Sequence, residues 1–127
     1  MIRVELALAV HGLLIKRFGG AVGLREKGLL EAALARPYQT FDGKELYADP
    51  ISKAAAVFES LIQNHPFVDG NKRVAYVLMR LTLLEAGLDI HATQLEKYEL
   101  VMSAAEGQIA RDEIENWLHR HTRAKRL

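Results

Sequence analysis

Apolar residues recur three or four positions apart along most of the chain, which is the spacing of amphipathic helices. Glycine suits the left-handed residue that follows a helix end, so Gly19 and Gly20 mark the end of the first helix. The pattern predicts that this helix is mostly buried. One of its strips carries polar or small side chains and another carries apolar ones: Glu5, Ala9, Gly12 and Lys16 on the first, and Val4, Leu8, Ile15 and Phe18 on the second.

Further helices follow with short connections between them. Asp49, just before Pro50, and Thr93 each place a capping oxygen at a helix start. Gly87 and Gly107 suit helix ends. No internal repeat or low-complexity segment appears in this order of elements. The helices are predicted over about residues 25–35, 50–63, 71–86, 94–106 and 110–121.

Residues 38–48 are the only region in which the pattern predicts strands. The turn signal Phe41-Asp42-Gly43 lies among aromatic residues and is typical of a short hairpin or flap. The predicted fold is therefore all-α, a compact bundle of about six helices with a short flap before the next loop. A chain of 127 residues supports one domain, covering residues 1–127.

Composition narrows the function classes. The net charge of +1 gives no strong field for indiscriminate nucleic-acid binding, and the absence of cysteine excludes disulfide and thiolate chemistry. Arg3 and the apolar residues after it faintly resemble a secretory signal, but the helical periodicity argues against that interpretation. No apolar run approaches the roughly 20 residues that span a bilayer. We expect a cytoplasmic protein with no membrane partner.

One short loop, residues 65–73, concentrates chemically active groups between two predicted helices. The backbone N–H groups of residues 70–73 therefore crown a helix N-terminus, where unpaired amides and the positive end of the dipole bind anions. Gly70 has no side chain to block phosphate. Arg73 adds a planar cationic fork, and Lys72 adds a flexible point charge. Phosphate is the predicted ligand.

Two further groups of this loop suggest chemistry. Asp69 would repel phosphate unless a metal ion lay between them, and Mg²⁺ typically takes one or two carboxylates together with phosphate oxygens. Histidine is the residue type best suited to accept a proton near neutral pH, so His65 is the candidate base for a hydroxyl acceptor. Singly, these residues have ordinary structural explanations as packed or turn-forming side chains. Together in one loop they favour a reactive site.

The run His65-Pro66-Phe67-x-Asp69-Gly70-Asn71-Lys72-Arg73 resembles the signature of the Fic/Doc (Fido) family. The resemblance covers about residues 10–120. It implies an all-helical fold and transfer of a phosphate-containing group from a nucleoside triphosphate to a protein hydroxyl. Other stretches resemble the death-on-curing branch of small toxins: Phe18-Gly19-Gly20, Gly23-Leu24-Arg25, the run at residues 30–37, and Lys53-Ala54-Ala55.

The resemblance also implies roles for single residues. His65 would be the catalytic base, Pro66 and Phe67 the anchor of the loop, and Asp69 the metal ligand. ATP or another nucleoside triphosphate would be the substrate, and Mg²⁺ would be the cofactor. The phosphates would be held by Gly70, Asn71, Lys72 and Arg73.

Position 72 separates two reactions within the family. Nucleotidyl transferases commonly have glycine there, whereas the death-on-curing branch has lysine. A long cation can reorient the nucleotide so that its terminal phosphorus faces His65, which favours a protein kinase. The resemblance then implies phosphorylation of a threonine on a translation factor such as elongation factor Tu, and a block of protein synthesis. AMP transfer stays open, because Pro66 and Gly70 follow the wider Fic pattern.

Control of the activity is predicted to come from another chain. Many Fic proteins carry an inhibitory helix with Ser or Thr four residues before a Glu-Gly or Glu-Asn pair. Ser103, Glu106 and Gly107 come near this pattern, but the spacing is one residue short. The resemblance therefore implies a toxin of a type II toxin–antitoxin module, inhibited by a cognate antitoxin whose disordered C-terminal segment folds into a groove. Nucleic acid would be contacted only through that complex.

Several alternatives stay open. The segment from Phe41 to Tyr47 is a candidate flap that would hold the acceptor beside His65. A catalytically inactive module that binds nucleotide or antitoxin is a second possibility. The basic tail is typical of a solvated, frayed terminus, with a nucleic-acid contact as the alternative: Arg120, Arg123, Lys125 and Arg126. The remaining histidines lack metalloprotease spacing and are interpreted as surface or packing residues: His11, His91, His119 and His121.

Overall fold

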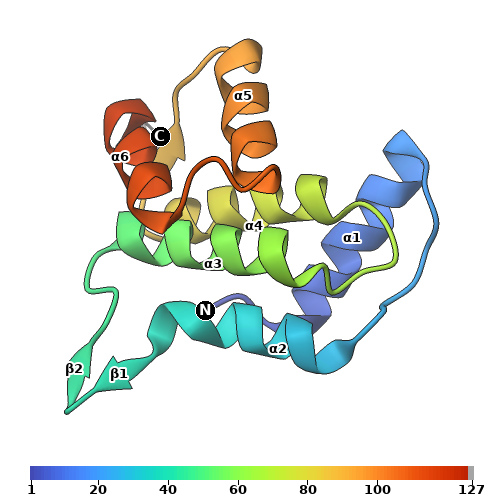
Figure 1. The fold of residues 1–127 in the computed structure, drawn as a ribbon, viewed down its shortest axis with the longest axis horizontal. Coiled ribbons are helices and arrows are strands. Elements are labelled where there is room, and N and C mark those ends of the chain that lie inside the picture. Colours follow the sequence, from blue (N-terminus) through green and yellow to red (C-terminus); the bar gives the residue numbers. More distant parts are fainter. Residues whose placement is uncertain (126–127) are drawn as a thin grey trace.

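The computed structural model describes residues 1–125. A short 3₁₀ turn, η1 (Arg36–Tyr38), follows the second helix. The predicted helical bundle and its order of elements are confirmed. None of the helices in this part of the chain is long and apolar enough to cross a bilayer. The six helices in Figure 1 are α1 (Val4–Phe18), α2 (Lys27–Ala35), α3 (Pro50–Asn64), α4 (Asn71–Glu85), α5 (Gln94–Ala105) and α6 (Arg111–His121).

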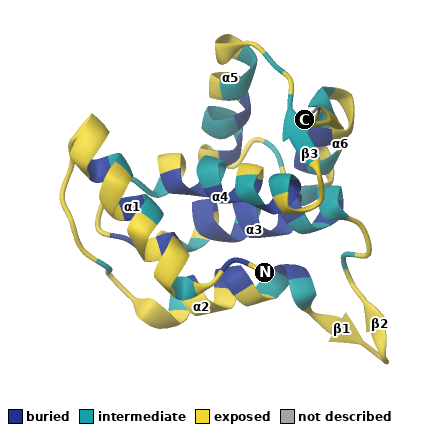
Figure 2. Cartoon of the chain, turned by 180° about the vertical axis from the view of Figure 1, so that it is seen from behind, coloured by how far each residue is buried: buried dark blue, intermediate teal, exposed yellow. Residues whose placement is uncertain are grey.

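Helix α3 forms the centre of the bundle. It contacts α2, α4, α5 and α6, and its ribbon in Figure 2 is largely in the colour of buried residues. The helix begins as the sequence predicts, because the Asp49 carboxylate accepts a hydrogen bond from the Ser52 N–H at 2.9 Å. Residues 54–56 are all fully buried alanines, and their small side chains allow neighbouring helices to approach closely. The helix is therefore buried on more than one stripe.

Helix α1 is less buried than its sequence pattern predicts. Its buried residues are Ala7, His11 and Ile15, whereas Leu8 and Phe18 are 39% and 52% exposed. The helix lies beside the connection from α3 to α4 (Figure 1), and of its three buried side chains the polar one, His11, contacts that loop. The predicted apolar strip is therefore confirmed only in part: Ile15 is buried and Val4 packs against the core, whereas the other two residues of the strip are exposed.

The predicted hairpin is confirmed. Strands β1 (Thr40–Phe41) and β2 (Lys44–Glu45) pair in antiparallel register, with Asp42 and Gly43 between them. Both turn residues have positive φ, 52° and 77°, which matches the twist of a two-residue hairpin. The hairpin is exposed and projects beyond the N-terminal end of α3 in Figure 1.

A second small sheet corrects two sequence predictions. Strand β3 (Leu88–Ile90) pairs in antiparallel register with β4 (Thr122–Ala124), so residues 38–48 are not the only strand region. The basic tail is ordered at least to Lys125, whose N–H donates to the Gly87 carbonyl at 2.8 Å. Arg126 lies outside the described residues. Pairing between segments so far apart leaves no local signal such as a hairpin turn, which explains the omission.

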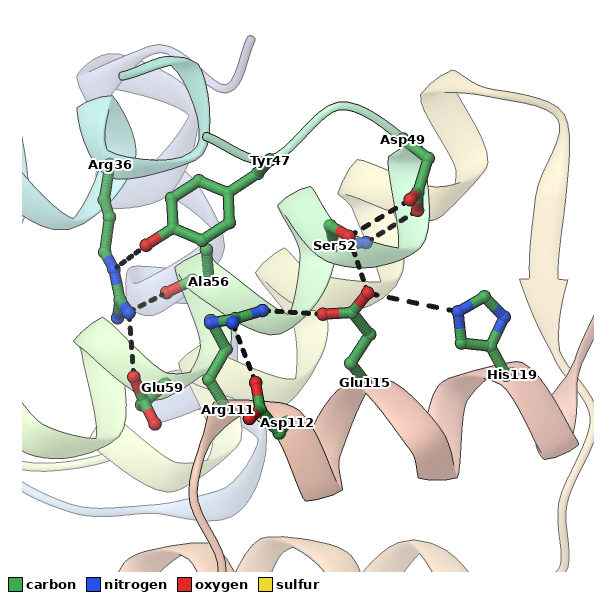
Figure 3. Close-up of polar contacts among 10 residues, drawn as sticks. All are labelled: Arg36, Tyr47, Asp49, Ser52, Ala56, Glu59, Arg111, Asp112, Glu115 and His119. Atoms are coloured by element: carbon green, nitrogen blue, oxygen red, sulfur yellow. Dashed lines mark hydrogen bonds and ion pairs between the residues drawn. The ribbon is translucent and has the colours of Figure 1, made fainter. Parts of the chain in front are cut away.

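A polar network joins the hairpin segment to the bundle (Figure 3). The Tyr47 ring lies between the guanidinium groups of Arg36 and Arg111, at 5.6 and 5.3 Å from its centroid. Arg36 donates to the Tyr47 hydroxyl at 3.1 Å and to the Glu59 carboxylate at 2.9 Å. Arg111 donates to Glu115 at 2.6 Å. These contacts connect the end of α2, the segment before α3 and the start of α6.

An ion pair attaches β3 to α4. Arg80 donates to both oxygens of Asp89 at 2.8 and 3.0 Å, a bidentate arrangement. These hydrogen bonds lower the pKa of Asp89 to about 2. Because the folded pKa lies below the ordinary value, the pair stabilises the fold above about pH 4, and this contribution is lost as the pH falls towards 2.

We therefore expect Asp89→Asn to destabilise the protein by on the order of 1 kcal/mol at neutral pH, because the pair is partly exposed. The difference from the parent should shrink between about pH 4 and pH 2. Urea denaturation at a series of pH values measures it. Asp112→Asn is the control, since that side chain is 83% exposed. If the difference in free energy of unfolding between Asp89→Asn and the parent stays constant down to pH 2, the ionisation of Asp89 is not its source.

Candidate active site

The loop at residues 65–73, hereafter the motif loop, connects the C-terminus of α3 to the N-terminus of α4. His65 follows α3 in a left-handed conformation with φ 47°, and Gly70 precedes α4 with φ 75°. The backbone N–H groups of Asn71, Lys72 and Arg73 have no hydrogen-bond acceptor within residues 1–125. Unpaired amides at a helix N-terminus, where the positive end of the helix dipole lies, are groups suited to bind an anion.

The carbonyl groups of the motif loop, in contrast, are mostly paired. Pro66 accepts from the N–H groups of Arg25 and Glu26 at 2.8 and 3.1 Å. Phe67 exchanges two hydrogen bonds of 3.0 Å with the Asn71 side chain, which donates through Nδ2 and accepts through Oδ1. The side-chain amide of Asn71 therefore closes the loop. Only the backbone N–H of Asn71 is left to bind an anion.

Residues 20–26 run alongside the motif loop and are called the strap below. Leu24 forms an isolated β-bridge with Phe67, and the Val68 N–H donates to the Gly23 carbonyl at 3.0 Å. The sequence predicts a helix from about residue 25, but α2 starts only at Lys27. Glu26 is extended, with φ −153° and ψ 110°, and its N–H and that of Arg25 both donate to the Pro66 carbonyl of the loop.

Arg25 of the strap also supports the strained residue of the loop. Its Nε donates to the His65 carbonyl at 2.8 Å and its Nη2 to the Asn64 carbonyl at 2.7 Å. A non-glycine residue in the left-handed region costs free energy and persists only when its surroundings hold it. The guanidinium also satisfies carbonyls at the C-terminus of α3. Arg25 therefore fixes the backbone that carries the His65 imidazole.

The His65 side chain is exposed, and its hydrogen bond defines its protonation pattern. Nδ1 lies 3.2 Å from the Gln63 carbonyl oxygen, which can only accept. The proton of the neutral ring is therefore on Nδ1, and the lone pair is on Nε2. An exposed Nε2 lone pair is what a general base needs.

Asp69 carries its carboxylate at the same end of α4. Its oxygens accept from the Ala21 N–H at 3.1 Å and the Gly70 N–H at 2.8 Å. These hydrogen bonds lower the pKa of Asp69, so the group is anionic at neutral pH. An exposed anionic carboxylate beside free amides fits Mg²⁺, which needs one or two carboxylates plus phosphate oxygens and water. Residues 1–125 contain no cluster of three or more His, Cys, Asp or Glu that could hold a metal.

Lys72 and Arg73 supply positive charge at this helix end. Both side chains are exposed, and within the described residues neither forms an ion pair. The Arg73 guanidinium lies over the Phe18 ring, 4.5 Å from its centroid. A cation held on an aromatic face is oriented and remains available to an anion.

These groups share one groove of about 780 Å³. The motif loop forms one end, and α1, α4 and α5 form the walls. The contribution of α5 was not predicted, because its residues carry no motif and reach the groove only through the fold. The groove is lined by His65, Val68, Asp69, Gly70, Asn71, Lys72 and Arg73 of the motif loop, and by Leu14, Phe18, Tyr76, Val77, Gln94, Lys97, Tyr98, Val101 and Met102.

The structure does not bring the candidate flap to this groove. Phe41 and Tyr47 do not line it, and the hairpin joins the opposite end of α3 from His65 (Figure 1). A helix of 15 residues separates the two by roughly 20 Å. Phe41 is 76% exposed, and Tyr47 packs in the arginine network of Figure 3. The expectation that these residues border the site is therefore corrected.

From the sequence, His11 was expected to be a surface or packing residue, and its contact with the motif loop was not predicted. The ring is 4% exposed, stacks on Phe67, and lies with Nε2 2.8 Å from the Asp69 carbonyl oxygen. The available signal was the spacing of His11, Ile15 and Phe18, which share one face of α1. Of the other histidines, His121 stacks on Trp117 and contacts Glu96.

The strap offers a test of how Asp69 is held. A Cβ at Gly20 would lie 2.7 Å from Asp69 Oδ2, whereas a Cβ at Gly19 would meet nothing within 4 Å. We expect Gly20→Ala to displace the carboxylate from the Ala21 N–H and to raise the pKa of Asp69 towards its ordinary value. NMR titration of the Asp69 carboxyl carbon measures this.

Gly19→Ala is the matched control, because Gly19 also has positive φ, 85° against 116° for Gly20. Both variants should lose roughly 1–2 kcal/mol from backbone strain. Only Gly20→Ala should move the pKa of Asp69. Equal pKa values in the two variants would show that the strap does not determine the ionisation of this carboxylate.

Sequence comparison with known proteins identifies the family of this chain. Residues 2–83, more than half of the chain, match the Fic/DOC family. A protein named Toxin Doc from Mycolicibacterium smegmatis is 51% identical over 59 residues, which are 46% of this chain and 45% of that protein, so the match spans less than half of that relative. Protein kinase doc from Escherichia phage P1 is 29% identical over 116 residues, 91% of this chain and 90% of that protein. The chain belongs to the Fic/DOC family.

Proposed function

We propose that this protein is a Doc-type toxin that transfers a phosphoryl group from a nucleoside triphosphate, ATP in the simplest case, to a serine or threonine hydroxyl of another protein. One observation carries the proposal. An exposed imidazole with its lone pair on Nε2 shares a groove with three free helix amides and an anionic carboxylate. A base, an anion site and a candidate metal ligand are what phosphoryl transfer requires.

The triphosphate would bind at the N-terminus of α4. The amides of Asn71, Lys72 and Arg73 point their N–H groups at the phosphate oxygens, and Gly70 leaves room for them. The Lys72 and Arg73 side chains neutralise the remaining charge. Asp69 would hold Mg²⁺, which when bound offsets the negative charge of the phosphates.

The proposed step forms one bond and breaks another. The acceptor hydroxyl oxygen forms a bond to the γ-phosphorus, and the bond from that phosphorus to the bridging oxygen breaks. His65 Nε2 takes the hydroxyl proton, and the nucleoside diphosphate leaves with the electron pair of the broken bond. The protein contributes alignment and charge neutralisation, and phosphoryl transfer depends mainly on these two factors.

Two features favour phosphoryl transfer over AMP transfer. Lys72 occupies the position where a long cation can reorient the nucleotide so that its terminal phosphorus faces His65. The phage P1 relative, similar over most of both chains, is named a protein kinase. By family resemblance, we propose a threonine of a translation factor such as elongation factor Tu as the acceptor, which would link the reaction to a block of protein synthesis.

Labelled ATP tests this function. We expect the protein to transfer label from γ-labelled ATP, and not from α-labelled ATP, to a protein in a bacterial lysate. His65→Ala should reduce the transfer by at least about 100-fold, the lower range for a lost general base. His91→Ala is the control, because His91 is exposed and does not line the groove.

Each alternative has its own outcome in this assay. Label transferred only from the α-position would replace the kinase with an AMP transferase. Nucleotide binding without any labelled acceptor would indicate an inactive binding module. Labelling that survives His65→Ala would contradict the assigned base. Mass spectrometry of the labelled protein identifies the added group and the acceptor residue together.

We also propose that a cognate antitoxin blocks this groove with a C-terminal segment that folds on binding. The apolar side of the groove supports the proposal, since Leu14, Val101 and Met102 line it beside Tyr98. Tyr98 is 62% exposed in the free chain, as an aromatic anchor for a partner would be. Contacts with nucleic acid would then be made only by the antitoxin in the complex.

Tyr98→Ala should weaken capture of the protein encoded by the neighbouring gene by at least about tenfold, the effect of losing an aromatic anchor. Leu95→Ala is a matched control on the same helix, 64% exposed and outside the groove. Calorimetry on purified components measures both affinities. Equal affinities of the two variants for the protein encoded by the neighbouring gene would argue against this partner. Normal growth of cells that express this protein without the neighbouring gene would also argue against it.

A further inference from the structure

We propose that His11 is a positioning residue of this site. By donating from Nε2 to the Asp69 carbonyl, it fixes the peptide between Asp69 and Gly70 and thereby orients the carboxylate and the amides that follow. This inference deepens the proposed function and rests on it for the identity of the ligand. The contact itself belongs to the fold, so part of its test is independent of any activity.

The geometry of the imidazole indicates more than packing. The ring is 4% exposed, and Nε2 lies 2.8 Å from the Asp69 carbonyl oxygen. A carbonyl only accepts, so Nε2 carries a proton. The ring also stacks on Phe67, with centroids 3.8 Å apart and planes 7° from parallel. The stack and the hydrogen bond together leave the ring a single orientation.

The bonded carbonyl stands at the junction on which the site depends. Asp69 carries the candidate metal ligand, and the next residue, Gly70, is the left-handed residue before α4. Rotating the peptide between them would move the Gly70 N–H away from the Asp69 carboxylate, to which it donates at 2.8 Å. It would also change the direction in which the free amides of α4 point. One hydrogen bond from His11 therefore controls two parts of the site.

The rest of the same face of α1 supports neighbouring parts of the site. Residues 11, 15 and 18 lie at the spacing of one helix face. Ile15 Cδ1 would be 3.1 Å from a Cβ placed on Gly70, and the Phe18 ring lies under the Arg73 guanidinium. Ile15 and Phe18 make apolar or cation–π contacts, whereas His11 makes the directional one.

Two substitutions separate the hydrogen bond from the packing. His11→Phe keeps an aromatic ring against Phe67 but has no donor. His11→Gln loses the ring but places an amide N–H near the position of Nε2. A residue that only fills space would tolerate phenylalanine better than glutamine. A positioning donor predicts the reverse order for ligand affinity at the site. This order is independent of which variant has the larger free energy of unfolding.

The experiment compares the full-length parent, His11→Phe and His11→Gln. Calorimetry with a non-hydrolysable ATP analogue and Mg²⁺ should show roughly 10- to 100-fold weaker binding for His11→Phe, as for other lost supports of a metal ligand. His11→Gln should remain within about threefold of the parent. In NMR spectra without ligand, the Gly70 amide resonance should move in His11→Phe and stay near its parent position in His11→Gln.

Three results would overturn the proposal. The first is an unprotonated Nε2 at His11 in the parent protein, as measured by the nitrogen chemical shifts of the ring. This measurement does not require any variant to fold. The others are equal analogue affinity in His11→Phe and the parent, and equal losses in the two variants. If the parent transfers no phosphate but the Gly70 resonance still follows the donor, the proposed function fails while the positioning role stands.

Discussion

The site depends on one constraint: the motif loop must keep two left-handed residues, His65 and Gly70, while leaving the first amides of α4 unpaired. His65 is strained in this conformation and the free amides expose polar groups, so the loop persists only if other contacts over-determine it. Those contacts come largely from outside the loop. Arg25 and its neighbours in the strap bind the carbonyls on the α3 side, and His11 of α1 binds the Asp69 carbonyl on the α4 side. Rigidity of this kind is the main resource for aligning reactants.

The division of hydrogen bonds explains the placement of charge. Carbonyl oxygens, which would repel phosphate, are mostly occupied by donors from the strap, from α1 and from Asn71. The N–H groups that attract phosphate remain free at the end of α4. The anionic Asp69 is held beside them by the backbone of the strap and by Gly70. The groove therefore presents donors, cations and one carboxylate, a set that fits a metal-bound polyphosphate.

Much of the fold and part of the candidate site could be predicted from local sequence. Periodicity and caps predicted the helices, as with Asp49 before α3 and Thr93 before α5. The motif predicted a helix start directly after Gly70, which is confirmed, and the anion site at that helix end stays a prediction. What could not be predicted depends on non-local packing. The pairing of β3 with β4, the contact of His11 with Asp69 and the wall formed by α5 join segments without a shared pattern. The candidate flap failed for a different reason: the helix predicted over about residues 50–63 lies between the hairpin and His65, and a helix of that length places them at opposite ends, roughly 20 Å apart.

The most direct test of a phosphate site at the start of α4 is a crystal structure of the parent protein with a non-hydrolysable ATP analogue and Mg²⁺. We expect phosphate oxygens within hydrogen-bond distance of the backbone nitrogens of Asn71, Lys72 and Arg73, a metal ion on Asp69, and the terminal phosphorus facing His65 Nε2. Phosphates bound away from the start of α4, with those three amides left to solvent, would contradict this assignment.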